Sequence, residues 1–203
     1  MMNKKMVIFD IDGVLANFEG TLVEYLREKY GKDASANRSM YSIEGRFAKR
    51  KDILADALAF TADPNSYYGL EPIEKGIDLV VQLMARDYPV LFLSGRPQVA
   101  QEMTIRWLRK NIKDYDLALG AACLGSLKMK RILSPEVKDL IEFVVDDNPE
   151  IVAELNKNGI LAYAWSQPWN AGTYPIIIPD DNHCADIFKN KFCEAVPFFD
   201  QWS

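Results

Sequence analysis

Two carboxylates follow an apolar run near the amino terminus. In the stretch MVIFDIDGVLANF, residues 6–18, Asp10 and Asp12 come after a segment apolar enough to lie inside a sheet. At the carboxyl end of a parallel strand both would border the ligand crevice, and one intervening residue would turn both side chains to the same side. Gly13 would let the backbone leave the strand sharply. Two carboxylates this close repel, and a hard cation such as Mg²⁺ is the simplest compensation.

Two further stretches offer groups that bind or neutralise phosphate. LFLSGRP places the Ser94 hydroxyl, the Gly95 amide and the Arg96 guanidinium after an apolar run, and all three suit phosphoryl oxygens. SLKMKR carries Lys128 and Lys130 just before an expected helix. Either ammonium could neutralise phosphate and nucleophile together.

A second carboxylate pair occurs in FVVDDNPE, where Asp146 and Asp147 follow another apolar run. This pair could complete the cation site, so that the chain would hold a nucleophile, a phosphate clamp, a cation and a screening lysine. Together these groups make up a phosphoryl-transfer site. The alternative is that the aspartates only cap loops or helices at strand ends.

Composition limits the remaining possibilities. The chain has 203 residues, 49% of them hydrophobic, which is enough for one core and a small accessory module. A net charge of −5 gives no global positive field for nucleic acid or an anionic membrane, and no segment approaches the ~18 apolar residues that span a bilayer. Three cysteines without a CxxC pair favour a reducing compartment, so we expect a cytoplasmic protein.

Apolar runs and amphipathic stretches alternate along the chain. This alternation predicts an α/β protein with a parallel sheet. We expect strands at 6–11, 89–95, 142–147, 160–165 and 174–179, and helices at 73–88, 100–112 and 149–159. Residues 17–70 look helical with no strand between them. We therefore expect a core domain of residues 1–16 and 71–203, with residues 17–70 forming a small helical cap inserted after the first strand.

At these residues the sequence resembles the haloacid dehalogenase superfamily of phosphatases. The superfamily's four motifs correspond, in order, to FDIDGV, LFLSGR, the lysine of SLKMKR, and FVVDDN. The match covers residues 6 to about 165 and implies a Rossmann-like core under a cap. It also implies an Mg²⁺-dependent reaction that passes through an aspartyl-phosphate.

The resemblance assigns a role to each motif carboxylate. Asp10 would attack phosphorus, and Asp12 would protonate the leaving oxygen and then activate water. Mg²⁺ would be held by Asp10, by the backbone carbonyl of Asp12, and by Asp146, with Asp147 in support.

The resemblance also assigns the phosphate contacts. Ser94 would hold a phosphoryl oxygen, and the motif lysine would be Lys128 or Lys130. The spacing along the sequence from Lys128 to the paired aspartates is closer to the pattern in related phosphatases, which favours Lys128. We expect Gly95, Arg96 and Lys130 to contact substrate.

Two subfamilies resemble different parts of the chain. YYGLEPIEKGIDLVVQL and the element Pro168, Trp169 and Asn170 are similar to the 5'(3')-deoxyribonucleotidases. SGRP and MTIRWLRKN are similar to the 3'-phosphatase domain of phage-type polynucleotide kinase, but the chain has no kinase P-loop. Because the protein is acidic, we favour a nucleotidase acting on (deoxy)nucleoside monophosphates, a small phosphorylated substrate. The alternatives are a polynucleotide 3'-phosphatase acting on a nucleic-acid end, and a non-catalytic binding protein of the same fold.

Several other residues are weaker candidates. Tyr67, Tyr68 or Phe47 could stack on a base, but aromatics such as Tyr67 and Tyr68 near a domain junction more often serve packing. The basic run 47–51 could reach a phosphate, but a solvated helix face is the favoured interpretation. We expect His183 to lie in a polar loop, and Cys123 to be a small buried residue without a base to activate it.

Overall fold

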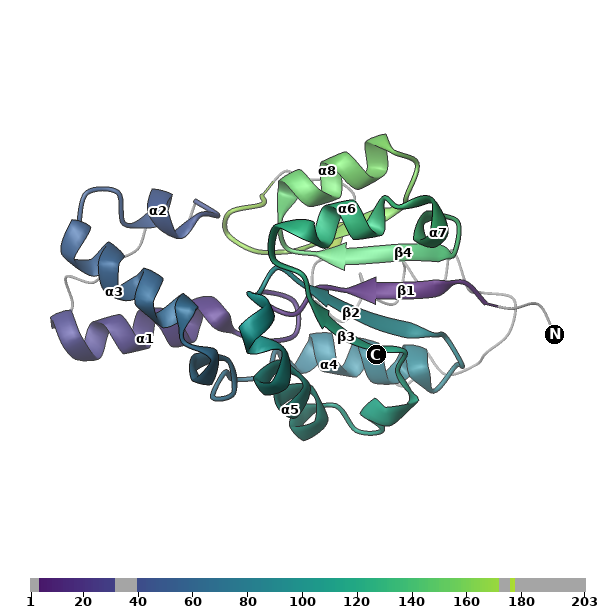
Figure 1. The fold of residues 1–203 in the computed structure, drawn as a ribbon, viewed down its shortest axis with the longest axis horizontal. Coiled ribbons are helices and arrows are strands. Elements are labelled where there is room, and N and C mark those ends of the chain that lie inside the picture. Colours follow the sequence, from purple (N-terminus) through teal and green to yellow (C-terminus); the bar gives the residue numbers. More distant parts are fainter. Residues whose placement is uncertain (1–3, 32–39, 172–175, 178–203) are drawn as a thin grey trace, which may run out of the picture.

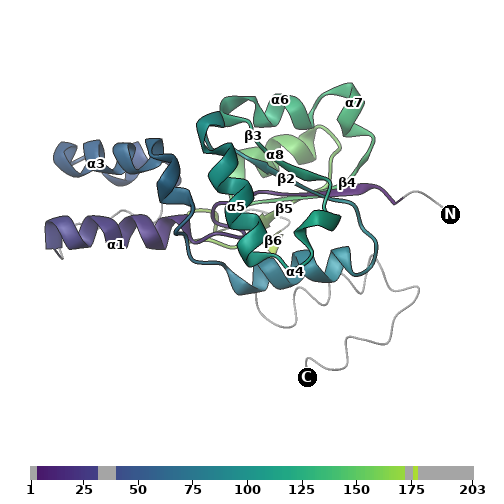
Figure 2. The same ribbon diagram turned by 60° about the horizontal axis from the view of Figure 1, so that its bottom comes forward.

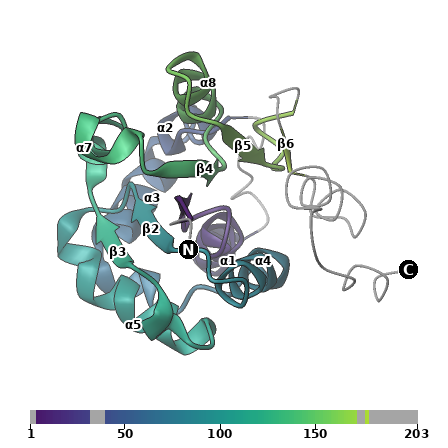
Figure 3. The same ribbon diagram turned by 90° about the vertical axis from the view of Figure 1, so that its right-hand side faces the viewer.

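The core of the protein is a parallel β-sheet. Our computed structural model describes residues 4–31, 40–171 and 176–177. Within this part of the chain the sheet has the strand order β3-β2-β1-β4-β5-β6, and every neighbouring pair is parallel (Figure 3). The strands are β1 (Met6–Phe9), β2 (Val90–Ser94), β3 (Gly120–Cys123), β4 (Ile141–Asp146), β5 (Ala162–Trp165) and β6 (Ile176–Ile177).

Five of these strands were expected from the sequence, because β-branched and aromatic side chains make them apolar on both faces. The strand β3 was not expected. Its sequence, GAAC, has a low intrinsic preference for a strand. It forms because it pairs with β2, and because the Gln101 side chain donates to the Ala121 carbonyl and accepts from the Cys123 amide.

Helices cover both faces of the sheet (Figure 2). Side chains of one parity along the strands, such as Phe9 and Phe92, pack in one cluster with α4 (Glu74–Met84) and α5 (Gln101–Asn111). Side chains of the other parity, such as Ile8 and Val144, pack with α6 (Lys128–Ile132), α7 (Pro135–Lys138) and α8 (Pro149–Lys157). The sheet is therefore buried on both sides, as a parallel sheet requires.

A helical cap lies between β1 and α4 along the chain. It comprises α1 (Phe18–Tyr30), α2 (Ile43–Arg46), α3 (Lys51–Ala62) and the 3₁₀ helix η2 (Pro64–Tyr67). Leu22 and Leu26 of α1 pack with Phe47 and with Ile53 of α3 in a cluster of their own. Figure 1 shows these helices standing at one end of the sheet. The expected arrangement of a core with an inserted cap is confirmed, while the domain limits at residues 17 and 70 stay predictions.

The remaining expectations concern bounds and location. Short 3₁₀ helices complete the connections: η3 (Gln98–Ala100), η4 (Tyr115–Leu117) and η5 (Gly125–Leu127). The expected strand at 174–179 is described only at β6, and His183 lies outside the described residues. Within the described ranges, no helix has the length and apolarity to cross a bilayer. The cytoplasmic location stays a prediction.

Candidate active site

The expected site residues lie at the carboxyl ends of three central strands. Asp10 directly follows β1, Ser94 ends β2 and Asp146 ends β4. In Figure 1 the arrowheads of β1 and β4 point toward the cap. The polar residues therefore meet at the edge of the sheet that the cap covers, which is the edge where ligands bind in open parallel sheets.

Lys128 bridges two buried carboxylates from different strands. Its Nζ lies 2.6 Å from Asp10 Oδ1 and 2.6 Å from Asp146 Oδ2. The other oxygen of Asp146 accepts the Asn148 amide at 2.9 Å, which fixes the turn after β4. Lys128 is buried at the first position of α6, whereas Lys130 is exposed on the same helix. The structure thus brings Lys128, and not Lys130, to the carboxylates.

Burial and neighbouring charges raise the pKa values of two carboxylates in the cluster. Burial raises the pKa of Asp10 to about 7, with Lys128 opposing and Asp146 and Asp12 adding to the shift. Burial also raises the pKa of Asp147, and the neighbouring Asp10 raises it further. Burial alone would lower the pKa of Lys128, but Asp10 and Asp146 outweigh it, and the net shift is upward.

The cluster fits a hard cation. Asp10, Asp146 and Asp147 each offer a carboxylate oxygen, and these three oxygens lie within 4.8 Å of one another. Three carboxylates exceed the single positive charge of Lys128, so a divalent ion would relieve repulsion that the lysine leaves. Asp12 is not part of this side-chain group. Its expected contribution to the metal was a backbone carbonyl, and that stays a prediction.

The Asp147 carboxylate is held against the loop that follows β1. Gly13 has φ +75°, and a Cβ at this position would lie 2.1 Å from Asp147 Oδ2. Asn170 Nδ2 donates to the Asp147 carbonyl at 2.9 Å and to the Trp165 carbonyl at 2.7 Å. Gln167 Nε2 donates to the Gly13 carbonyl at 2.7 Å. The loop after β5 therefore ties the turn after β1 to the turn after β4.

Arg96 follows β2 at the site, as the sequence predicts, and its guanidinium pairs with a carboxylate. Its Nε and Nη2 donate to the two carboxylate oxygens of Asp12, at 2.8 and 2.7 Å. Its Nη1 donates to Thr104 Oγ1 at 2.9 Å, and its backbone amide donates to Ser94 Oγ at 3.1 Å. The guanidinium is thus paired with Asp12, and its expected contact with a phosphate stays a prediction.

A cavity of about 580 Å³ lies between the cap and the carboxylates. Its lining includes Asp10, Asp12, Gly95 and Ser94 from the core, and Phe18, Tyr41, Arg46, Tyr67 and Trp169 around the remainder. The size is typical of a small-molecule site, for which the range is roughly 300–1,000 Å³.

Solved structures share this architecture at low identity. A haloacid dehalogenase family hydrolase from Deinococcus radiodurans, with bound phosphate and sodium, matches with TM-score 0.54 and 17% identity over 94% of this chain and 96% of its own. A haloacid dehalogenase-like hydrolase from Streptococcus pneumoniae gives 0.54 and 18% over 82% and 86%. The chain has the haloacid dehalogenase fold. No protein-family model matches the sequence.

The fold alone does not determine which reaction the protein catalyses. An L-2-haloacid dehalogenase has the same fold, with TM-score 0.52 and 12% identity over 92% of this chain and 99% of its own. One fold hosts several chemistries, so the function has to be argued from the residues of this site.

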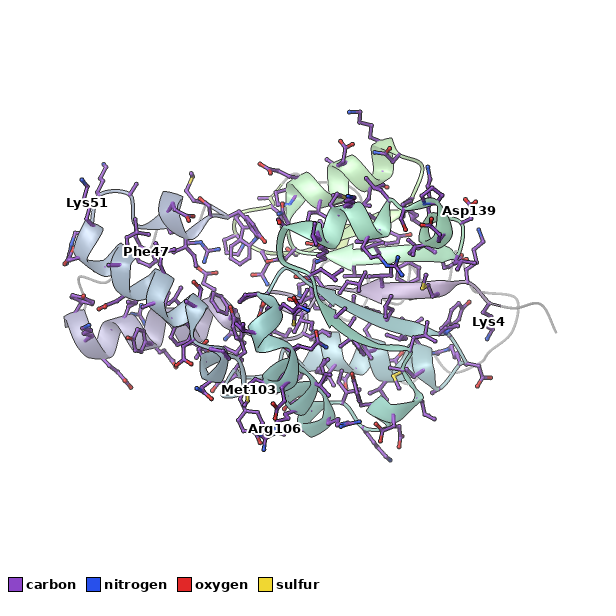
Figure 4. The ribbon with its side chains drawn as sticks, viewed as in Figure 1. Lys4, Phe47, Lys51, Met103, Arg106 and Asp139 are labelled. Carbon is purple, nitrogen blue, oxygen red and sulfur yellow. The ribbon has the colours of Figure 1, made fainter. Side chains whose placement is uncertain are left out.

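The three residues that could stack on a base lie in different environments of this fold. Tyr67 lines the cavity, but Tyr68 is 42% exposed on the outside and Phe47 is buried inside the cap. Figure 4 shows Lys51, from the basic run 47–51, at the outer end of the cap. This run therefore does not reach the site.

Sequence reasoning missed two cap residues that contribute to the cavity. The Arg46 guanidinium lies 4.5 Å from the Trp169 ring centroid, and the Tyr41 ring packs on the same indole at 6.4 Å. Tyr41 lies just before α2 and Arg46 is its last residue, so the short helix α2 places both side chains, and no motif marks them. Trp169 was expected only as part of the Pro-Trp-Asn element that is similar to the deoxyribonucleotidases. No sequence pattern indicated that the cap would close on it.

Proposed function

We propose that the protein is a magnesium-dependent phosphomonoester hydrolase that works through an aspartyl-phosphate. The observation that carries this proposal is the placement of Asp10. Its buried carboxylate lies at a strand end, against Lys128 and beside a second carboxylate that faces the cavity, Asp12. In this arrangement Asp10 would be the nucleophile, Lys128 the charge-neutralising group and Asp12 the proton carrier.

The reaction then has two balanced halves. In the first, an oxygen of Asp10 bonds to phosphorus while the bond to the leaving oxygen breaks, and Asp12 gives that oxygen a proton. In the second, Asp12 takes a proton from water, whose oxygen bonds to phosphorus and releases Asp10. The Lys128 ammonium, 2.6 Å from the Asp10 carboxylate, favours the ionised form that attack requires and opposes the effect of burial on the pKa of Asp10. The Ser94 hydroxyl, which lines the cavity, would donate to a phosphoryl oxygen.

Asp10, Asp146 and Asp147 would hold the magnesium ion. When bound, the ion supplies positive charge that offsets the negative charge of the phosphoryl group. The solved structure from D. radiodurans contains phosphate together with sodium, and so provides a precedent for an anion and a cation in this fold.

For the substrate, we propose a nucleoside monophosphate. Support comes from the cavity, whose lining combines the rings of Phe18, Tyr41, Tyr67 and Trp169 with the cation of Arg46. Aromatic faces suit the stacking of a base. A cavity of this size, bordered by the cap, favours a mononucleotide over a long strand.

The test is a panel assayed at fixed salt. It compares kcat/KM for deoxyribonucleoside and ribonucleoside monophosphates, sugar phosphates and a 3'-phosphorylated oligonucleotide. We expect mononucleotides to lead by tenfold or more. A tenfold lead of the oligonucleotide would favour the polynucleotide 3'-phosphatase instead, and absence of turnover for every phosphomonoester would favour the non-catalytic binding protein.

Asp10→Asn tests the covalent step. The substitution keeps the volume of the side chain but removes the attacking carboxylate, so we expect turnover to vanish with the fold intact by circular dichroism. Near-normal magnesium-dependent activity in this variant would contradict the aspartyl-phosphate.

A further inference from the structure

We infer that Arg96 is the positioning residue for Asp12, and that it acts on the proton given to the leaving group and not on phosphate binding. This inference rests on the proposed function, because it assigns Asp12 the role of proton carrier. It starts from the bidentate pair that joins the loop after β1 to the loop after β2, across 84 residues of sequence.

The burial of the two partners is unequal. The Arg96 side chain is 1% exposed, whereas that of Asp12 is 26% exposed. Both residues line the cavity, and the carboxylate is the more exposed member of the pair. Each Asp12 oxygen accepts one N–H from Arg96 and keeps a second lone pair for a proton or for water.

Other contacts fix the guanidinium itself. Thr104 Oγ1 accepts its Nη1, and the ring of Tyr67 lies 4.5 Å from its central carbon. Thr104 comes from α5 and Tyr67 from the cap, so both the core and the cap hold the plane of Arg96. Burial opposes the charge of Arg96, but Asp12 outweighs burial, and the pKa of Arg96 rises. The group remains a cation next to Asp12.

This geometry sets which substrates should depend on Arg96. A fork of two parallel hydrogen bonds fixes both the position and the rotation of the Asp12 carboxylate. An alkyl phosphate, such as a nucleotide, releases an alkoxide unless a proton arrives as the bond breaks. The acidic phenol of an aryl phosphate can leave without receiving a proton. Misplacing Asp12 should therefore slow alkyl phosphates selectively, while loss of a phosphate clamp would slow both classes alike.

The experiment compares Arg96→Lys with wild type on two substrates, the best mononucleotide and 4-nitrophenyl phosphate. The lysine keeps a positive charge but cannot form the fork. Because kcat/KM reports steps up to leaving-group departure, we expect it to fall about 100-fold for the nucleotide, within the usual range for acid–base help, and less than about fivefold for the aryl ester. Equal losses on both substrates would overturn the inference and restore the phosphate clamp.

Two further variants test whether the substrate selectivity comes from the placement of Arg96. Thr104→Val removes the acceptor of Nη1 without removing Arg96, and it should show the same selectivity with a smaller loss, about tenfold for the nucleotide. Arg106→Lys is the matched control, because Arg106 points to the surface of α5, with its side chain 59% exposed (Figure 4). Arg106→Lys should leave kcat/KM unchanged for both substrates. A loss in this variant equal to that in Arg96→Lys would count against the inference.

A second readout separates this inference from the proposed function. In the wild-type protein the Arg96 Nε–H should exchange slowly with solvent by ¹⁵N NMR, and Asp12→Asn should accelerate that exchange at least tenfold. Fast exchange in the wild type would overturn the pairing whether or not the protein hydrolyses phosphate. Slow exchange with no turnover of any phosphomonoester would instead overturn the proposed function and leave the Asp12–Arg96 pair standing.

Discussion

A single ammonium lies between two of the three carboxylates that could hold a metal. Lys128 reaches Asp10 and Asp146 at equal distances, while Asp147 has its carboxylate against Gly13. Lys130 is two positions away on the same short helix but is exposed. The two lysines therefore provide a matched pair for testing which one supports the reaction.

Lys128→Met should reduce kcat about 10²–10³-fold, the usual scale for removing one preorganised electrostatic group. The reason is that methionine keeps most of the side chain's length but leaves Asp10 and Asp146 without their partner. Lys130→Met should stay near wild-type activity. Steady-state kcat on the best substrate measures the effect of each variant. A larger loss in Lys130→Met than in Lys128→Met would assign the motif role to Lys130.

Gly13→Ala should weaken both the fold and the cation site. The residue has φ +75°, which costs a non-glycine residue roughly 1–2 kcal/mol, and the added Cβ would displace the Asp147 carboxylate. We expect a lower melting temperature and a higher magnesium requirement. Gly69→Ala is the control, because a Cβ added at Gly69 would meet no heavy atom within 4 Å and the residue does not have a left-handed φ. Unchanged magnesium dependence in Gly13→Ala would contradict the role of Asp147.

At the scale of elements, two asparagines brace the two ends of β5. Asn170 donates to the Trp165 and Asp147 carbonyls beside the site, and its Oδ1 accepts the Gln167 amide. Asn156 donates to the Val152 and Ala162 carbonyls at the other end of the strand, and its Oδ1 accepts the Ala162 amide. The two side chains make equivalent sets of bonds, but of the two only Asn170 touches a metal-site residue.

Asn170→Ala and Asn156→Ala should each lower stability, by about 1–3 kcal/mol, because each leaves backbone groups unpaired. Their effects on magnesium should differ. Asn170→Ala frees the loop that carries Asp147 and should raise the apparent Kd for magnesium several-fold, whereas Asn156→Ala should not. Thermal unfolding and magnesium titration measure the two effects. Equal magnesium affinities in the two variants would show that the loop does not position Asp147.

The elements of the core could be predicted, because β1, β2, β4 and β5 are apolar on both faces and end at polar residues. Two features could not be predicted. The strand β3 consists of small residues and depends on β2 and Gln101, which lie far from it in sequence. The pairing of Arg96 with Asp12 likewise depends on how two loops approach each other. A motif identifies the type of residue at a position, but its partner is decided by tertiary packing.

At the scale of the whole molecule, the cap completes a site that the sheet begins. Arg46 and Tyr41 of the cap segment pack on Trp169 of the core, and Tyr67 packs on Arg96. These contacts lie across the cavity that holds Asp10 and Asp12. The cap thus borders the pocket of the carboxylates, where burial raises the pKa of Asp10 and increases the benefit of a bound cation.

This coupling predicts how the stability of the whole protein depends on pH and magnesium. Asp10 and Asp147 have raised pKa values in the folded state, so without metal their contribution to stability is fully present below the unfolded value near 4. That contribution is lost as the pH rises through the folded value, about 7 for Asp10. Magnesium needs the ionised carboxylates, so protons and metal compete for the site.

We therefore expect magnesium to raise the melting temperature clearly at pH 8 and little at pH 5, with each kcal/mol of stabilisation worth about 2–4 °C in a chain of this size. Asp147→Asn should raise the metal-free melting temperature at pH 8, because it removes one of the repelling charges, and it should reduce the magnesium shift. Asp56→Asn is the control, since Asp56 lies in the cap and Lys29 and Tyr30 lower its pKa. Differential scanning calorimetry at the two pH values measures both effects. A magnesium shift as large at pH 5 as at pH 8 would mean that the ion does not bind these carboxylates.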